Sequence, residues 1–124
     1  MVFFELFSNA PDILRIPAGH ALFHEGDEGR CMFVLTIGSA EVYVKNRRVE
    51  VLVPGNMVGE LALVTRGPRT ATVLALEDSE FVSIDEERFN YLVQHTPYFA
   101  LNVMRLLAER LAAASSALPA VEDV

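Results

Sequence analysis

Two short stretches of this 124-residue chain combine residue types that suit the capture of a small anion. Gly59 lets the backbone approach a ligand closely because it has no Cβ, and residues 60–64 can begin a helical turn whose unpaired N–H groups point at an anion. Further along, Arg69 adds a permanent cation with a planar fork of donors. Glu60 repels a phosphate, so it is better suited to accept hydrogen bonds from hydroxyl groups. This order of residues predicts a site for a phosphate held against a ribose.

The segment from Gly59 to Val73 resembles the phosphate-binding cassette of the cyclic-nucleotide-binding domain family. That family includes kinase regulatory subunits, cyclic-nucleotide-gated channels and bacterial catabolite-activator-type regulators. Three upstream segments resemble the family's earlier turns and strands in the same order: 23–29, 33–42 and 53–60. A single piece of this kind is a weak signal, but several pieces at compatible spacing are a strong one. The resemblance covers roughly residues 11–112.

The resemblance implies a role for each residue of the cassette. Arg69 would pair with the exocyclic oxygens of a cyclic phosphate, and Glu60 would accept a hydrogen bond from the ribose 2′-hydroxyl. Thr70 would place a hydroxyl near the phosphate that also reaches the amino group of a syn guanine, so it tolerates either nucleotide. The other implied contacts are the backbone of Gly59, the amides of Leu61, Ala62 and Thr70, and the base-pocket residues Val42 and Leu52. Those last two would also be core residues in any β-protein.

Other chemistries lack the residues they need. His20 and His24 would share one face of a strand, but a zinc site takes three or four ligands and no nearby third His or Cys follows. Cys31 is the only cysteine, which excludes an iron–sulfur cluster and suits a small apolar strand residue. The sequence suggests neither a Ser/His/Asp triad nor paired carboxylates in a cleft. We therefore expect no metal site, no cofactor and no catalysis.

The composition favours a small cytoplasmic domain. The net charge of −7 argues against nucleic-acid binding by this chain alone, because phosphate backbones require clustered cations. The one dense basic spot, residues 45–48, is expected at a solvated hairpin tip. A lone cysteine indicates a reducing compartment, and neither a signal peptide nor a membrane-spanning run is evident.

Short runs rich in Val, Ile, Leu and Phe, separated by turn residues, fill residues 13–84. Such spacing is typical of a β-sandwich or barrel. The alternation expected of half-buried strands appears at five valines: Val42, Val44, Val49, Val51 and Val53. By resemblance the fold is mainly β, an eight-stranded double-stranded β-helix of jelly-roll-like β-roll type. A short packed helix is expected at residues 1–7.

The end of the chain predicts two helices, the first over residues 86–93 and the second over about 97–115. Asp85 is a suitable N-cap for the first, and Thr96 with Pro97 for the second. We expect a single domain over 1–115, followed by a frayed tail at 116–124.

These features predict a non-catalytic sensor of cyclic nucleotides, with cAMP favoured over cGMP. The C-terminal helix would close over the base, with Met104, Leu107 and Arg110 as candidates for the capping residue. The chain would be either a fragment of a longer regulator or a free-standing protein that acts on a separate partner or dimerises through this helix. The rival hypothesis is a degenerate β-roll scaffold that binds no nucleotide.

Overall fold

The computed structural model describes residues 12–117, and the chain divides into two compact units, Met1–Asn90 and Tyr91–Val124. The predicted helix at residues 1–7 lies outside the described residues. The domain boundary at 115 stays a prediction. The first unit contains eight strands: β1 (Ile13–Ile16), β2 (Ala21–Phe23), β3 (Met32–Ile37), β4 (Ala40–Val44), β5 (Arg47–Leu52), β6 (Met57–Val58), β7 (Thr72–Ala75) and β8 (Ser79–Ile84).

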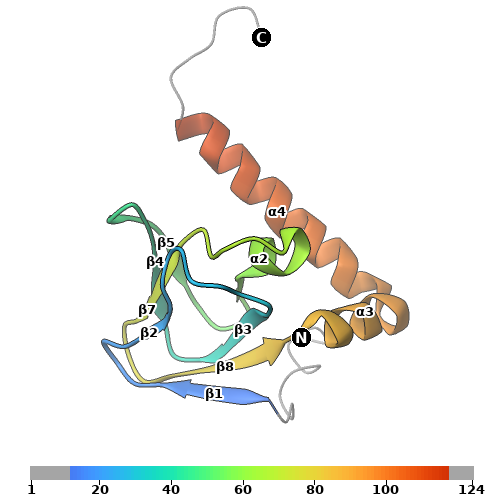
Figure 1. The fold of residues 1–124 in the computed structure, drawn as a ribbon, viewed down its shortest axis with the longest axis horizontal. Helices are drawn as coiled ribbons and strands as arrows, with labels where there is room; N and C mark the ends of the chain where they lie inside the picture. The colour runs from blue at the N-terminus through green and yellow to red at the C-terminus, as the bar shows by residue number, and fades with distance from the viewer. Residues whose placement is uncertain (1–11, 118–124) are drawn as a thin grey trace, which may run out of the picture. The chain divides into compact units, whose positions relative to one another are not determined.

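The strands form two four-stranded antiparallel sheets, which confirms the predicted mainly β fold. One sheet has the order β1-β8-β3-β6 and the other β2-β7-β4-β5. Figure 1 shows these sheets as two layers. The core cluster is built from the inner faces of both layers, and its members are Phe23, Phe33, Leu35, Ala40, Val42, Leu52, Val58, Val73 and Phe81.

The hairpin between β4 and β5 turns at Lys45 and Asn46, whose φ values are 52° and 65°. Two consecutive residues with positive φ match the tight turn that suits the twist of a β-hairpin. The predicted hairpin tip is therefore confirmed, although Arg47 and Arg48 already belong to β5.

The valines at positions 49, 51 and 53 share the exposed face of β5 and of the residue after it. Val49, Val51 and Val53 are 54%, 45% and 52% exposed, whereas Leu52 is completely buried. The alternation predicted at these residues is therefore present, with the three valines on the outer face. The cause is the pairing with β4, which sets Leu52 opposite the buried Ala40 and so turns the odd-numbered residues outward.

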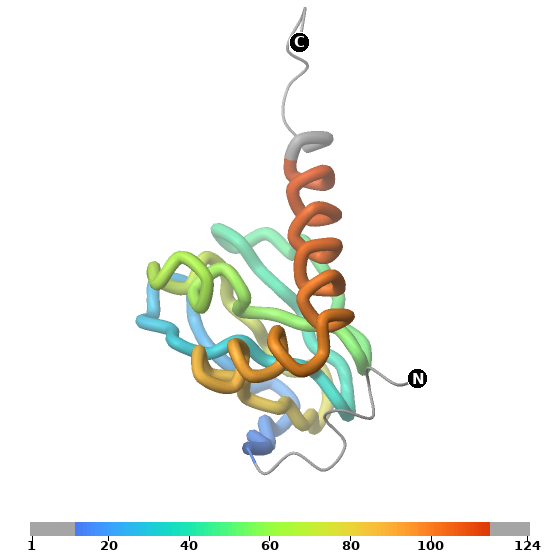
Figure 2. The backbone as a smooth tube through the Cα atoms, turned by 90° about the vertical axis from the view of Figure 1, so that its right-hand side faces the viewer, coloured from blue at the N-terminus to red at the C-terminus, as the bar shows by residue number. Residues whose placement is uncertain are grey.

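Three helices lie within the described residues: α2 (Glu60–Thr65), α3 (Glu86–His95) and α4 (Pro97–Ala117). The predicted N-cap of α3 is confirmed, because the Asp85 Oδ1 atom accepts a hydrogen bond of 2.8 Å from the backbone N–H of Arg88. Figure 2 shows the coloured part of α4 as one continuous helix. By its bounds, α4 also includes two residues that had been assigned to the frayed tail, Ser116 and Ala117. None of these helices has the length and apolar character needed to cross a membrane.

Candidate functional site

The cassette connects β6 to β7 through α2. Gly59 precedes this helix in the left-handed conformation, with φ of 83° and ψ of 7°. A glycine adopts this conformation without the steric cost that a Cβ imposes. The chain can therefore turn sharply from β6 into α2, as the sequence predicted for residues 60–64.

Arg69 lies almost completely inside this turn, with 6% of the residue exposed. Its Nη1 atom donates to the carbonyl oxygen of Cys31 at 2.6 Å and to that of Gly59 at 3.2 Å. The guanidinium therefore lies beside Gly59, immediately before α2, as the predicted phosphate site requires.

Two phenylalanines support the guanidinium from the β-roll. The Arg69 Cζ atom lies 4.3 Å from the ring centroid of Phe23 and 5.4 Å from that of Phe33. Distances of this order allow a cation–π attraction, which is stronger where water is excluded. The two rings thereby restrict where the positive charge can lie.

Two glycines leave the space through which the Arg69 side chain passes. A Cβ built on Gly29 would lie 2.2 Å from the Arg69 Nε atom, and one built on Gly59 would lie 2.6 Å from Nη1. Sequence reasoning had treated Gly29 only as part of a turn. Its φ is not positive, so its requirement comes from side-chain packing with a segment that is distant in the chain.

The charge of Arg69 is only partly satisfied by these contacts. Burial lowers its pKa from the ordinary arginine value, although a guanidinium stays protonated in proteins. Among residues 12–117 no carboxylate forms an ion pair with it, and its buried Nε atom has no hydrogen-bond partner there. A buried cation that donates only to neutral carbonyls among these residues, and whose Nε–H donor has no acceptor there, is chemically suited to bind an anion.

The backbone around Arg69 is fixed to the turn that contains Gly29. The Arg69 N–H donates to the carbonyl of Asp27 at 2.8 Å, and the N–H of Gly26 donates to the carbonyl of Arg69 at 2.8 Å. These two bonds join the Arg69 backbone to the turn, so the position of the arginine depends on both the cassette and the turn.

The other predicted contact residues fall into two groups. Glu60 and Ala62 are each 2% exposed, in the first turn of α2, whereas Leu61 and Thr70 are exposed beside them. Val42 and Leu52 belong to the core cluster of the β-roll. The structure thus brings Gly59 and Arg69 into contact, and the ligand roles of all eight residues stay predictions.

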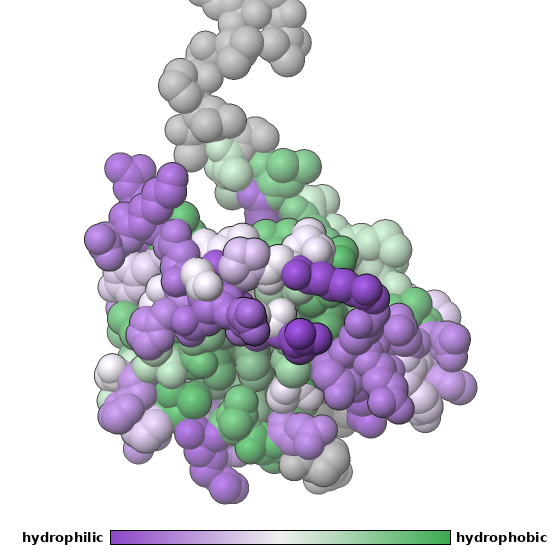
Figure 3. Space-filling model, viewed as in Figure 1, coloured by the Kyte–Doolittle hydropathy of each residue, from purple (hydrophilic) through white to green (hydrophobic). Residues whose placement is uncertain are grey.

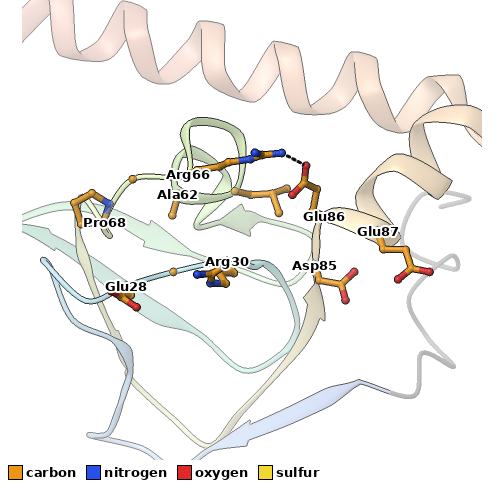
Figure 4. A pocket seen from close by; sticks show the side chains of 11 residues that line it. Glu28, Arg30, Ala62, Arg66, Pro68, Asp85, Glu86 and Glu87 are labelled. Carbon is orange, nitrogen blue, oxygen red and sulfur yellow. Dashed lines mark hydrogen bonds and ion pairs between the residues drawn. The ribbon is translucent and has the colours of Figure 1, made fainter.

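A hollow of about 810 Å³ opens next to the cassette, and no feature of the sequence predicted it. It is lined by Glu28, Gly29, Arg30, Ala62, Leu63, Arg66, Gly67, Pro68, Asp85, Glu86 and Glu87. Figure 4 shows the Arg66 side chain reaching from the end of α2 to Glu86, and their ion pair measures 2.6 Å. Figure 3 shows hydrophilic side chains gathered on this face of the unit. Ala62 alone among the predicted contact residues lines this hollow.

The charge of this hollow disfavours an anion. Its wall carries four acidic side chains against two arginines, so a phosphate would meet an excess of negative charge. Within residues 12–117 no group of three or more His, Cys, Asp or Glu side chains is placed to hold a metal ion.

Both the sequence and the fold match known proteins. Residues 13–96 match the family model described as the cyclic nucleotide-binding domain. The cyclic AMP receptor protein of Thermus thermophilus is 31% identical over 100 residues, which are 77% of this chain and 46% of that protein. The first curated relatives are all longer, since this chain spans at most 46% of their length.

Two solved structures show the same architecture. The crystal structure of the Thermus thermophilus catabolite activator protein has a TM-score of 0.76 and 28% identity, covering 90% of this chain and 60% of that one. A structure from work on a cyclic-GMP-dependent signalling pathway of bacterial phytopathogenesis has a TM-score of 0.73 and 29% identity, covering 90% and 89%.

Proposed function

This chain belongs to the cyclic nucleotide-binding domain family, and from that premise we propose that it is a non-catalytic receptor for a purine 3′,5′-cyclic nucleotide. The observation that supports the proposal most directly is the buried guanidinium of Arg69, held by two neutral carbonyls beside Gly59. A phosphate at this point would form a direct ion pair with the guanidinium, which no carboxylate of residues 12–117 does.

We propose one role for each part of the cassette. Arg69 binds the exocyclic phosphate oxygens, the amides that follow Gly59 complete the cradle, and Glu60 accepts a hydrogen bond from the ribose 2′-hydroxyl. Glu60 is the first residue of α2 and is almost fully buried, so a hydroxyl partner would be shielded from competing water.

The charge of the site favours a cyclic phosphodiester over a phosphate monoester. A cyclic phosphodiester carries one negative charge, whereas a monoester carries about −1.5 to −2 near neutral pH. The proposed site offers one guanidinium, with Glu60 close to it in the chain and seven excess negative charges on the whole protein. The second charge of AMP would therefore be repelled rather than bound.

The relatives are named for both nucleotides, since one is a cyclic AMP receptor and the other comes from a cyclic-GMP-dependent pathway. We propose cAMP as the preferred ligand. We also propose that α4 transmits ligand binding by closing over the base, to a second copy of the chain, a separate partner or a longer protein of which this chain is a part. A ligand can drive such a step only by binding the two states with different affinity.

Thermal unfolding with cAMP, cGMP and AMP tests the receptor proposal. Ligand at a hundred times its dissociation constant stabilises a folded protein by about 2.7 kcal/mol, so we expect the Tm to rise by roughly 10 °C with cAMP. AMP is the matched control and should give little or no shift. An unchanged Tm with millimolar amounts of either cyclic nucleotide would contradict the proposal and support the scaffold hypothesis.

Replacing Glu60 with alanine tests the hydroxyl contact. Because hydrogen bonds to a charged group contribute about 1.5–3 kcal/mol, Glu60→Ala should weaken cAMP binding by about ten- to a hundredfold in calorimetry. Binding of 2′-deoxy-cAMP should hardly change, since that ligand lacks the hydroxyl. Equal losses for both ligands would remove the hydroxyl role and indicate a structural role for Glu60.

A further inference from the structure

An acidic side chain lies on the inner face of the β-roll, on strand β5. Along β5, Val51 is exposed and Leu52 is completely buried, because successive side chains point to opposite faces of a strand. Glu50 is two residues from Leu52 and half-buried, so it shares the inward face.

The strand register places this acid in a row with two apolar residues. Glu50 pairs with Val42 on β4, and Val42 pairs on its other side with Val73 on β7. Neighbouring strands are about 4.8 Å apart, so Glu50 lies about 10 Å from the backbone of Val73. The row Val73–Val42–Glu50 begins four residues after Arg69 and ends at the edge strand of the sheet.

Val42 is a predicted base-pocket residue of the proposed nucleotide site, so this row would run along the base. With its phosphate at Arg69, the nucleotide can lay its base over Val42 and reach Glu50 with the far edge of the ring. Positions 2 and 6 of a purine lie on opposite sides of N1. A purine that turns position 6 toward β5 would present it to Glu50, with position 2 on the far side of N1.

The chemistry of position 6 differs between the two purines. Adenine carries a 6-amino group that donates hydrogen bonds, and guanine carries a 6-oxo group that accepts them. An ionised carboxylate is an acceptor only. A carboxylate beside position 6 therefore attracts adenine, whereas with guanine it places two acceptors against each other in a partly desolvated site.

We propose that Glu50 determines base specificity by accepting a hydrogen bond from the 6-amino group of adenine, an inference that rests on the proposed nucleotide site. The alternative is that Glu50 protects the exposed edge strand β5 from pairing with another chain, as inward-pointing charges do in many sheets. The two roles differ in what a change at position 6 of the ligand does.

Calorimetric titration of the whole chain with cAMP and inosine 3′,5′-cyclic monophosphate tests the proposal, because inosine replaces the 6-amino group with a 6-oxo group and adds no 2-amino group. The wild-type protein should bind cAMP about ten- to a hundredfold more tightly. Glu50→Gln should reduce this preference to within about threefold, since an amide can turn either its oxygen or its NH₂ toward the ligand. Glu41→Gln is the matched control, because Glu41 lies on β4 next to Val42 and on the outer face, paired with Arg48 at 2.9 Å.

Each outcome decides one question. A wild-type preference near one, or a preference for the inosine nucleotide, overturns the role of Glu50 without any variant. An unchanged preference in Glu50→Gln overturns it as well and supports the edge-protection role. If the wild-type protein binds neither ligand, the proposed receptor function itself fails. Measuring Tm without ligand confirms that each variant is folded.

Discussion

Replacing Arg69 with alanine is expected to weaken cyclic-nucleotide binding by about 30- to several thousandfold, since truncating one partner of a buried charge pair costs about 2–5 kcal/mol. The side chain is the buried cation beside Gly59, and its fork of donors matches phosphate oxygens. Arg69→Lys keeps the charge but loses the fork and the planar stacking on Phe23, so it should recover only a small part of the affinity. Calorimetry with cAMP measures both losses.

Arg66→Ala is the matched control for this experiment. Arg66 lies three residues before Arg69, in the same cassette, but its side chain is 76% exposed and its ion pair with Glu86 is at the surface. Exposed ion pairs contribute about 0–1 kcal/mol, so the affinity and Tm of Arg66→Ala should stay close to the wild-type values. Equal affinity of Arg69→Ala and wild type would exclude Arg69 from the ligand site.

The surroundings of Arg69 hold its side chain where the proposed phosphate site needs it. Its side chain is restricted by two carbonyl acceptors and two aromatic rings, so little conformational entropy is left to lose when a ligand binds. The carbonyl contacts are to neutral groups, and exchanging or sharing them with an anion strengthens the electrostatic interaction. The same contacts that stabilise the folded chain therefore prepare the site.

Local sequence signals predicted the local structure well. The turn at Lys45 and Asn46, the helix after Gly59 and the N-cap at Asp85 each depend on a few neighbouring residues, and each is present. The orientation of β5 was harder to predict from the sequence. Its register with β4, and not its own valines, decides which of its residues face the core. A sequence pattern reports which residues alternate but does not say which of the two faces is inside.

The surroundings of Arg69 could not be predicted for a related reason. The resemblance pointed to Arg69 itself, but Phe23, Gly29 and Cys31 approach it from a segment about 40 residues earlier in the chain. Contacts of this kind depend on how the two sheets pack, and no spacing within either segment encodes them. Unlike the turn glycines with positive φ, Gly29 has an ordinary φ, and the sequence does not reveal this difference.

Replacing Gly29 with alanine is expected to displace Arg69 and so to weaken cAMP binding nearly as much as Arg69→Ala does. The added Cβ would lie 2.2 Å from the Nε atom and 2.4 Å from the Cζ atom, closer than non-bonded atoms can approach. Since the guanidinium would lose its two carbonyl partners and its place over Phe23, the free energy of unfolding should fall by about 1–3 kcal/mol. Gly67→Ala is the matched control in the cassette, because its Cβ would lie 3.3 Å from the Thr65 Oγ1 atom alone.

A double-mutant cycle separates this explanation from a general defect at the Gly29 turn. If the clash with Arg69 causes the loss of stability, the second substitution removes it, and Gly29→Ala/Arg69→Ala should unfold at nearly the same denaturant concentration as Arg69→Ala alone. Additive losses would mean that alanine is poorly tolerated at position 29 for a reason unrelated to the arginine. A strongly non-additive cycle, together with the loss of cAMP binding in Gly29→Ala, would show that a glycine outside the cassette controls where its cation lies.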